Sequence, residues 1–332
     1  MMQNKSLILI LLIVLSVTVT PGETFAPVGT VVGQFMEIGM GARGAAMGEA
    51  YTTGASGAEA VFWNPAGLVD GGNNQLFVSQ TQWPADMAFG GAALSMTFGN
   101  LGTFAVSSVY LMTDDMEITS LDAPNGTGEF FSLSNYTLGL SYARYLTDRV
   151  SIGLTGKMVR EEYLDHGYSA WSLDLGSIYR TGFHGLKLGM SIMHFGPEIR
   201  FSGDYIDYSD QKSYLPDPQV PKEFQTYSLP VMFRFGSSIN LLDKPGHRVT
   251  AAGDMIHPNN NVELYNLGVE YAFREMVSLR SGYKFAADEG GLTVGAGLKM
   301  DLMDWTTLCI DYSYSDLGLL TNSHRFSLGI SF

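Results

Sequence analysis

The sequence is poor in cysteine, in charge and in long apolar runs. Cys309 is the single cysteine among 332 residues, so neither an intramolecular disulfide nor a cysteine-based metal site can form. Charged residues make up 16% of the chain, which is low for a soluble globular protein. Beyond residue 26, no apolar run reaches the roughly 18 residues that a transmembrane helix needs. A disulfide-stapled domain and a helical membrane protein are both excluded.

Positive charge is scarcer still. The chain has 19 Lys and Arg residues against 33 Asp and Glu residues, which gives a net charge of -14. Nucleic acid is therefore an unsuitable partner, since its phosphates require a basic contact surface. What the chain has instead is 39 glycines and 12% aromatic residues. Low charge with much glycine and aromatic content indicates extensive sheet or lipid-facing surface.

The first 26 residues have the layout of a secretory signal peptide. Lys5 precedes an apolar run from Leu7 to Val14, and small and polar residues follow. Such a segment is too short for a stable membrane span. We predict cleavage after Ala26, with Gly22 as the alternative, and export of the mature chain. If an exported chain without transmembrane helices enters a membrane, it does so as a β-barrel.

From Gln75 to the C-terminus, apolar residues alternate with small or polar ones, as they do in strands. In "WSLDLGSIY", Trp171 and Leu173 share one face, and Ser172 and Asp174 share the other. Fourteen strands are predicted at about 75–83, 86–98, 102–112, 131–145, 150–162, 169–180, 185–195, 226–239, 247–257, 262–273, 276–286, 291–301, 305–315 and 323–332.

Short and long connections alternate between these strands. "LTDR" and "TGFHG" are short, whereas "EYLDHGYS" and the segment around "GDYIDYSDQKSYLPDPQVPK" are longer and more acidic. Outer-membrane barrels show this alternation. A soluble β-sandwich is the alternative, but the second face here is mostly Gly, Ser and Ala with isolated charges, which suits a crowded barrel interior. We predict an all-β fold, a 14-stranded antiparallel transmembrane β-barrel over 75–332, in a bacterial outer membrane.

The last strand ends on an aromatic residue. A final alternating strand that ends in Phe resembles the signal read by the barrel-assembly machinery of the outer membrane. The residues of this predicted assembly signal are Phe326, Leu328, Gly329, Ile330 and Phe332.

Residues 27–74 do not alternate and are dense in Gly and Ala. Asn64 is a good N-cap and Pro65 suits the first helical position, so "WNPAGL" predicts a helical turn. Gly44 and Gly48 permit close approach of backbones. About eight strands already suffice for a side-chain-filled barrel, so fourteen leave space in the lumen. We therefore predict that 27–74 form a hatch there, with the motif residues Gly39, Gly41, Arg43, Gly44, Gly48, Asn64, Pro65, Ala66 and Gly67.

The chain resembles the PorV/PorQ family of outer-membrane proteins, which is related to the FadL fatty-acid transporters. "FMEIGMGARGAAMGEAY", "AVFWNPAGL", "FGPEIRF", "LPVMFRFG" and the C-terminal block ending in "HRFSLGISF" carry the resemblance. It implies a 14-stranded barrel with an N-terminal hatch, embedded in outer-membrane lipid.

Two functions follow from the resemblance. The first is a component of type IX protein secretion, with secreted cargo proteins or secretion-system subunits as partners. The second is a FadL-like channel whose ligands are hydrophobic small molecules such as long-chain fatty acids, or a detergent in their place. A third hypothesis is a structural role, in which the plugged barrel only serves as a scaffold for partner proteins.

Other motifs are weaker. Gly39, Gly41 and Gly44 match G-x-G-x-x-G, with Glu59 following, but no βαβ unit surrounds them, so no nucleotide cofactor is expected. The six histidines lack paired spacing, and neither a metal site nor an enzyme activity is predicted. In the longest connection, Tyr205, Tyr208 and Tyr214 are predicted to contact a partner, since aromatic side chains are favoured in binding surfaces.

Overall fold

The structure is a computed structural model of the whole chain, and it describes residues 29–120, 122–164, 166–206, 221–285, 290–303 and 305–332. The predicted signal peptide, residues 1–26, lies outside the described residues. Within them, no helix is both long and apolar enough to span a membrane.

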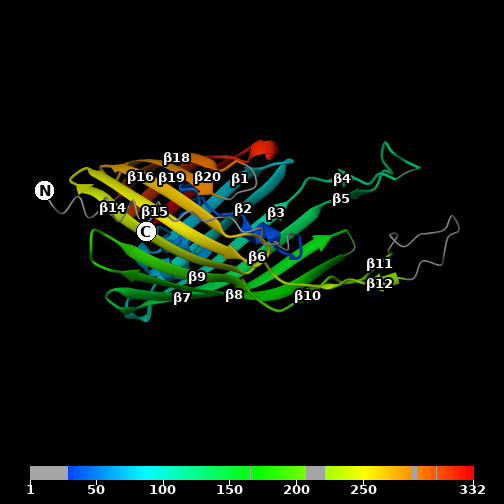
Figure 1. Cartoon of the computed structure of the whole chain (residues 1–332), viewed down its shortest axis with the longest axis horizontal. Helices are drawn as coiled ribbons and strands as arrows, with labels where there is room; N and C mark the ends of the chain where they lie inside the picture. The colour runs from blue at the N-terminus through cyan, green and yellow to red at the C-terminus, as the bar shows by residue number, and fades with distance from the viewer. Residues whose placement is uncertain (1–28, 121, 165, 207–220, 286–289, 304) are drawn as a thin grey trace.

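Fourteen antiparallel strands close into a barrel, as the sequence predicts (Figure 1). Neighbouring strands along the chain pair with each other, and β20 pairs with β1 to complete the ring. The barrel strands are β1 (Gln75–Trp83), β2 (Met87–Thr97), β3 (Thr103–Met112), β6 (Leu133–Thr147), β7 (Val150–Tyr163), β8 (His166–Arg180), β9 (Lys187–Phe195), β14 (Met232–Lys244), β15 (His247–Pro258), β16 (Leu264–Phe273), β17 (Val277–Phe285), β18 (Leu292–Met303), β19 (Thr306–Asp316) and β20 (Asn322–Ser331).

The alternation in the sequence sorts side chains between the two faces of this wall. Trp171 and Leu173 of β8 are exposed on the outer face, whereas Ser172 and Asp174 are buried inside. The same division holds in β16, where Leu267 faces out and Asn266 faces in. An apolar outer face and a polar interior are the arrangement that a strand wall needs in lipid, where closure also satisfies every backbone hydrogen bond.

Two predicted segments differ from the observed ones. The strand predicted over 226–239 is displaced, because Thr226–Tyr227 (β13) pairs with Ile199–Arg200 (β10) outside the barrel. Pro230 follows, and proline cannot donate a backbone hydrogen bond. The strand then continues to Lys244 through a bulge. The connection predicted around "EYLDHGYS" is mostly strand, because β7 and β8 pair up to Tyr163 and His166.

Short turns gather at one end of the barrel, which we call the short-turn end, and the longer connections lie at the other, the long-connection end. At the latter, small two-stranded sheets extend beyond the barrel (Figure 1). The sequence did not predict them. They are β4 (Met116–Glu117) with β5 (Phe130–Phe131), β10 with β13, and β11 (Asp204–Ile206) with β12 (Pro221–Glu223).

The residues of the predicted assembly signal lie on β20 and at its end. Phe326 and Leu328 are exposed on the outer face, and Ile330 and Phe332 follow along the strand. Gly329 is paired with Cys309 of β19. The amide of Phe332 donates to the carbonyl of Asn74 at 2.9 Å, so the chain end lies beside the start of β1 at the short-turn end. Recognition by the assembly machinery stays a prediction.

Residues 29–74, which we call the N-terminal segment, lie within the barrel and are coloured blue in Figure 1. Val31 bridges to Ser228 near the long-connection end, and the segment passes into β1 at the short-turn end. It contains η1 (Gln34–Glu37), α2 (Ala42–Ala46), η2 (Gly57–Phe62) and η3 (Pro65–Gly71). Each of these helices is short. Contacts with the barrel wall, rather than helix length, hold the segment in place.

Glycines on the inner face of the wall make room for the segment. A Cβ at Gly176 of β8 would overlap the Oδ1 of Asn64, and one at Gly153 of β7 would overlap the backbone of Pro65. On the opposite side, a Cβ at Gly282 of β17 would overlap the backbone of Met47 and Gly48. The inward glycines of the strands are therefore docking positions for the N-terminal segment.

A side chain at such a position should displace the segment. We expect Gly176→Val to destabilise the protein by about 1–3 kcal/mol through overpacking and to expose residues 29–74 to protease. Gly156→Val is the matched control, because a Cβ there has its nearest neighbour at 3.9 Å, in the side chain of Leu173. Urea unfolding and limited proteolysis measure both effects. Equal behaviour of the two variants would contradict the docking assignment.

Candidate functional site

The Asn64-Pro65-Ala66 motif joins the N-terminal segment to the wall. The Oδ1 of Asn64 accepts the amide of Ala66 at 3.1 Å and so caps η3, with Pro65 at its first position. The Nδ2 donates to the carbonyl of Thr52 at 3.1 Å and to those of Ser177 and Met190, on β8 and β9, at 3.2 and 3.4 Å. One amide thus caps a helix and bonds to two strands. The helix is longer than the single turn expected from the sequence.

Trp63 lies at the centre of the segment. Its Nε1 donates to the carbonyl of Met40 at 2.8 Å, and its ring meets that of Tyr51 edge-on at 5.6 Å. The guanidinium of Arg234 from β14 lies over the ring at 5.2 Å. A Cβ at Gly44 would come within 2.5 Å of this indole. Gly44 therefore accommodates a ring, whereas Gly48 gives the close backbone approach expected of both glycines, against Tyr283.

The other motif residues also lie inside the barrel. A Cβ at Gly39 would meet Trp63 and Glu49, and one at Gly67 would overlap the carbonyl of Ala55. Gly41 has a φ of 92°, which favours glycine, and its Cβ position is adjacent to the Oε1 of Glu59.

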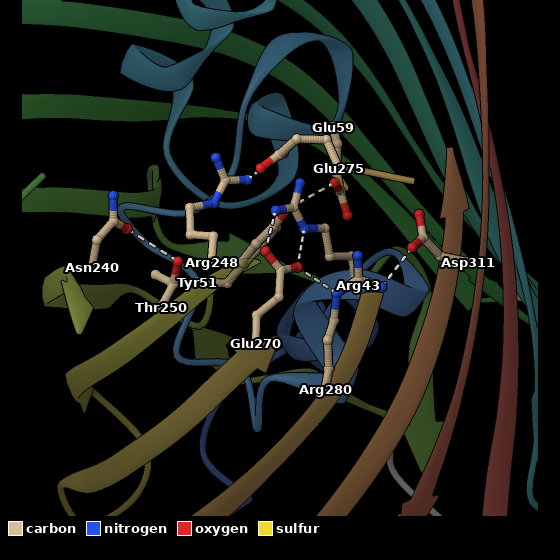
Figure 2. A network of polar contacts seen from close by, with 10 residues as sticks. All are labelled: Arg43, Tyr51, Glu59, Asn240, Arg248, Thr250, Glu270, Glu275, Arg280 and Asp311. Carbon is tan, nitrogen blue, oxygen red and sulfur yellow. Dashed lines mark hydrogen bonds and ion pairs between the residues drawn. The ribbon is translucent and has the colours of Figure 1, made fainter. Parts of the chain in front are cut away.

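Arg43 of α2 anchors the segment electrostatically. Its Nη2 and Nε bind the two oxygens of Glu270 on β16 at 2.9 and 3.0 Å (Figure 2). Arg280 of β17 donates to Glu270 at 2.6 Å and to Asp311 of β19 at 2.6 Å. This ionic network, Arg43–Glu270–Arg280–Asp311, joins the segment to three strands. Bidentate arginine–carboxylate pairs are both strong and directional.

Further polar contacts hold the rest of the segment. Asp254 of β15 accepts the amides of Tyr51 and Thr52 at 3.0 and 2.8 Å and the hydroxyl of Thr52 at 2.6 Å. Lys284 of β17 pairs with Glu49 at 2.5 Å. The inner face of β14–β19 is thus a charged surface on which the segment is fixed.

Glu59 of η2 lies beside this network. Its Oε2 accepts the hydroxyl of Tyr51 at 3.1 Å, while its Oε1 has no hydrogen-bond partner. Burial raises the pKa of the Glu59 carboxyl to about 7, an effect that the charge of Arg43 partly opposes. Glu59 is therefore a carboxyl of the segment whose charge changes near neutral pH.

The other side of the interior is more apolar, with the buried Glu161 of β7 accepting the amide of Gly33 at 3.0 Å. Phe35, Tyr168, Ile199 and Leu229 form a buried cluster with Val32 and Val159, and we call this the apolar cluster. A cavity of about 30 Å³ lies close by, between η1 and the inner faces of β3 and β7. One end of it is polar, because Lys157 lies there, 2.6 Å from Asp174 and 3.1 Å from His194.

The wall beside this cluster is interrupted. The β8–β9 ladder runs from Arg180 to Leu173 and shifts register before Phe195, with His194 at a φ of 62°. Farther toward the long-connection end, β8 and the described residues after β9 bond again, where the amide of Ser202 donates to the carbonyl of Gly167 at 2.9 Å. A cavity of about 630 Å³ lies at this interruption, lined by residues that include Tyr168, Trp171 and Ile199. It adjoins the apolar cluster on one side and the exposed Trp171 on the other.

The predicted partner-binding tyrosines are only partly described. Tyr205 lies on β11, with its ring 5.1 Å from that of Phe224, in one of the sheets that extend beyond the barrel. Tyr208 and Tyr214 lie outside the described residues. Partner contact through these side chains stays a prediction.

No protein-family model matches the chain, and no curated protein matches it either. Solved structures do match. The toluene transporter TbuX of Ralstonia pickettii has a TM-score of 0.55 at 15% identity, over 88% of this chain and 97% of that one. A Pseudomonas aeruginosa FadL homologue has a TM-score of 0.58 at 12% identity, over 88% and 98%. The toluene transporter TodX of Pseudomonas putida has a TM-score of 0.52 at 12% identity, over 88% and 96%.

At these identities the likeness shows a shared fold, the closed 14-stranded barrel. Two of these neighbours, TbuX and TodX, are described as toluene transporters.

The ionic network yields a double-mutant prediction. We expect Arg43→Gln and Glu270→Gln each to lower the free energy of unfolding, and the double variant to lose less than the sum. The coupling should be about 1–2 kcal/mol, as for side chains in one network. Urea unfolding followed by tryptophan fluorescence gives the three values. Strictly additive losses would show that the pair does not hold the segment.

Glu59 gives a prediction about pH. Because its pKa is about 7 in the folded protein and about 4.5 in an unfolded chain, the protonated form favours folding. The contribution of the Glu59 carboxyl to the free energy of unfolding is fully present below pH 4.5 and is lost as pH rises through 7. Glu59→Gln should therefore flatten the stability profile between these values and raise stability at pH 8. Glu129→Gln, at an exposed position, is the control; an unchanged profile in Glu59→Gln would overturn the assignment.

Proposed function

We propose that the protein is an outer-membrane channel for hydrophobic small molecules, such as long-chain fatty acids or monoaromatic hydrocarbons. The observation that carries the proposal is the apolar cluster inside the barrel, next to the interruption between β8 and β9. Hydrophobic ligand sites are concave, largely apolar and supplied with a few polar groups. The cavity of about 630 Å³ at the interruption has the size of such a site, and Tyr168, Trp171 and Ile199 line it beside Arg160.

In this proposal the ligand enters from the long-connection end, contacts the apolar cluster and leaves sideways between β8 and the segment 196–202. A sideways exit spares an apolar molecule from crossing the charged half of the interior, where its passage is costly. The N-terminal segment then acts as a hatch that closes the lumen toward the short-turn end, held by the ionic network and by Asn64. The fold neighbours described as toluene transporters support this choice.

The secretion role implied by the sequence resemblance gains no support from the solved structures. They favour the hydrophobic channel, which the sequence left as the alternative. Type IX secretion, with its cargo proteins and secretion subunits, stays a prediction, and one experiment separates the two roles. Deletion of the gene should lower uptake of labelled oleate or toluene and leave the set of secreted proteins unchanged. Lost secretion with normal uptake would overturn the channel proposal.

A single substitution tests the route itself. Ala170 of β8 faces inward and packs against the apolar cluster. Ala170 also lines the cavity at the interruption, so Ala170→Trp should fill part of that cavity. Uptake of labelled ligand should fall about tenfold, without a change in the amount of folded protein. Ala296→Trp is the control, because Ala296 is exposed on the outer face of β18, where a tryptophan contacts lipid. Equal uptake by the two variants would show that the route lies elsewhere.

A further inference from the structure

A second large cavity opens inside the barrel near the short-turn end, on the far side of the N-terminal segment from the apolar cluster. Its volume is about 630 Å³, within the range of small-molecule sites. It is bounded by the segment and by the ends of β6, β8, β9, β14, β15 and β16. Figure 2 shows part of its wall, where Arg43 binds Glu270 and Arg248 binds Glu275.

The charges around this cavity are mainly positive. Arg43, Arg180, Lys187 and Arg248 line it, against the two carboxylates of Asp70 and Glu270, and Arg248 also binds Glu275 outside the lining at 2.7 Å.

Those two acids are shared among more than two cations. Asp70 pairs with Arg180 and lies 3.9 Å from the Nζ of Lys187. Glu270 binds both Arg43 and Arg280. The ammonium of Lys187 thus lies 3.9 Å from a carboxylate, Asp70, that already binds Arg180. The Lys187 side chain lines the cavity and is 35% exposed.

The surplus follows a wider pattern on the inner wall. In the described strands, cationic side chains that are buried or line the interior outnumber acidic ones, while the N-terminal segment inside the barrel adds one cation, Arg43, and four acids, Glu37, Glu49, Glu59 and Asp70. The cations are Lys157, Arg180, Lys187, Arg234, Arg248, Arg280, Lys284, Lys299 and Arg325, and the acids are Glu161, Asp174, Asp254, Glu270 and Asp311. The segment's acids offset much of the strands' positive charge, but only Asp70 among them lines this cavity, so the cationic surplus persists here.

Neutral groups complete the cavity. The rings of Tyr51 and Tyr145 form apolar surfaces, and Arg180 lies 5.1 Å from the centre of the Tyr145 ring. Ser56 and Ser238 add hydroxyls, while Asn240 and Thr250 bond to each other at 3.1 Å. Cations, hydroxyl groups and flat apolar surfaces around one volume suit a ligand with anionic oxygens on a small organic body.

We propose that this cavity is a binding site for small organic anions that carry a carboxylate or a phosphate group, with Lys187 as the principal contact and the paired Arg180 and Arg248 beside it. The site goes beyond the hydrophobic channel, from which the N-terminal segment separates it. Its presence or absence leaves the channel proposal unchanged. Carboxylate and phosphate share the chemistry that these cations recognise, as oxygen acceptors for charge-assisted hydrogen bonds.

Calorimetric titration of the purified full-length protein in neutral detergent, at low salt, tests the proposal with two probes, succinate and inorganic phosphate. At least one probe should bind with one-to-one stoichiometry. Binding should weaken in 0.5 M sodium chloride, because salt at this concentration shortens the Debye length to about 4 Å and screens the attraction between cations and ligand. Lys187→Gln should weaken binding about tenfold, the loss expected for one hydrogen bond to a charged group.

The matched control is Lys244→Gln, which removes the same charge at the same end of the barrel from an exposed residue outside the cavity lining. Binding of succinate alone assigns a carboxylate ligand, and binding of phosphate alone assigns a phosphate ligand. No binding of either probe overturns the site. Equal weakening by Lys187→Gln and Lys244→Gln also overturns it, because the effect is then one of net charge. Unchanged urea unfolding of each variant verifies that it folds.

Discussion

Closing fourteen strands into one ring leaves a lumen that wall side chains cannot fill, and the rest of the structure depends on this constraint. Lipid requires the closure, since an open sheet edge would leave backbone groups without partners. The N-terminal segment fills the lumen, and glycines on the inner face bring its backbone against the strands. Asn64 and Arg43 then supply the directional contacts that hold it in one position.

The filled interior divides into two chemically different halves. Toward β3, β7 and β8, the segment presents Phe35 and its neighbours to an apolar part of the wall, beside an interruption in the sheet. Toward β14–β19, it meets Asp254, Glu270 and Arg280, and the cavities there are polar. In the two proposals made above, hydrophobic and anionic molecules have separate places in one barrel, with the same segment forming a wall of each.

Much of the barrel could be predicted from the sequence, because a period of two residues sorts Trp171 from Ser172 without reference to any other strand. The Asn64 cap was also local and hence readable. The displaced strand β14 was not, since Thr226 and Tyr227 alternate correctly yet pair with β10. Nor could the sequence show that Arg43 meets Glu270 across 227 residues, or that Lys157, His194 and Asp174 converge. Such sites arise from strand register and closure, which no local pattern encodes.

The proposed channel requires a hydrophobic ligand to occupy the apolar cluster inside the barrel. Crystals grown with a bromine-labelled alkyl or aryl ligand test it most directly, through the anomalous signal of the bromine. A ligand in the channel gives a bromine peak beside Phe35 and Tyr168, next to the interruption between β8 and β9. A peak confined to the outer, lipid-facing surface would contradict it.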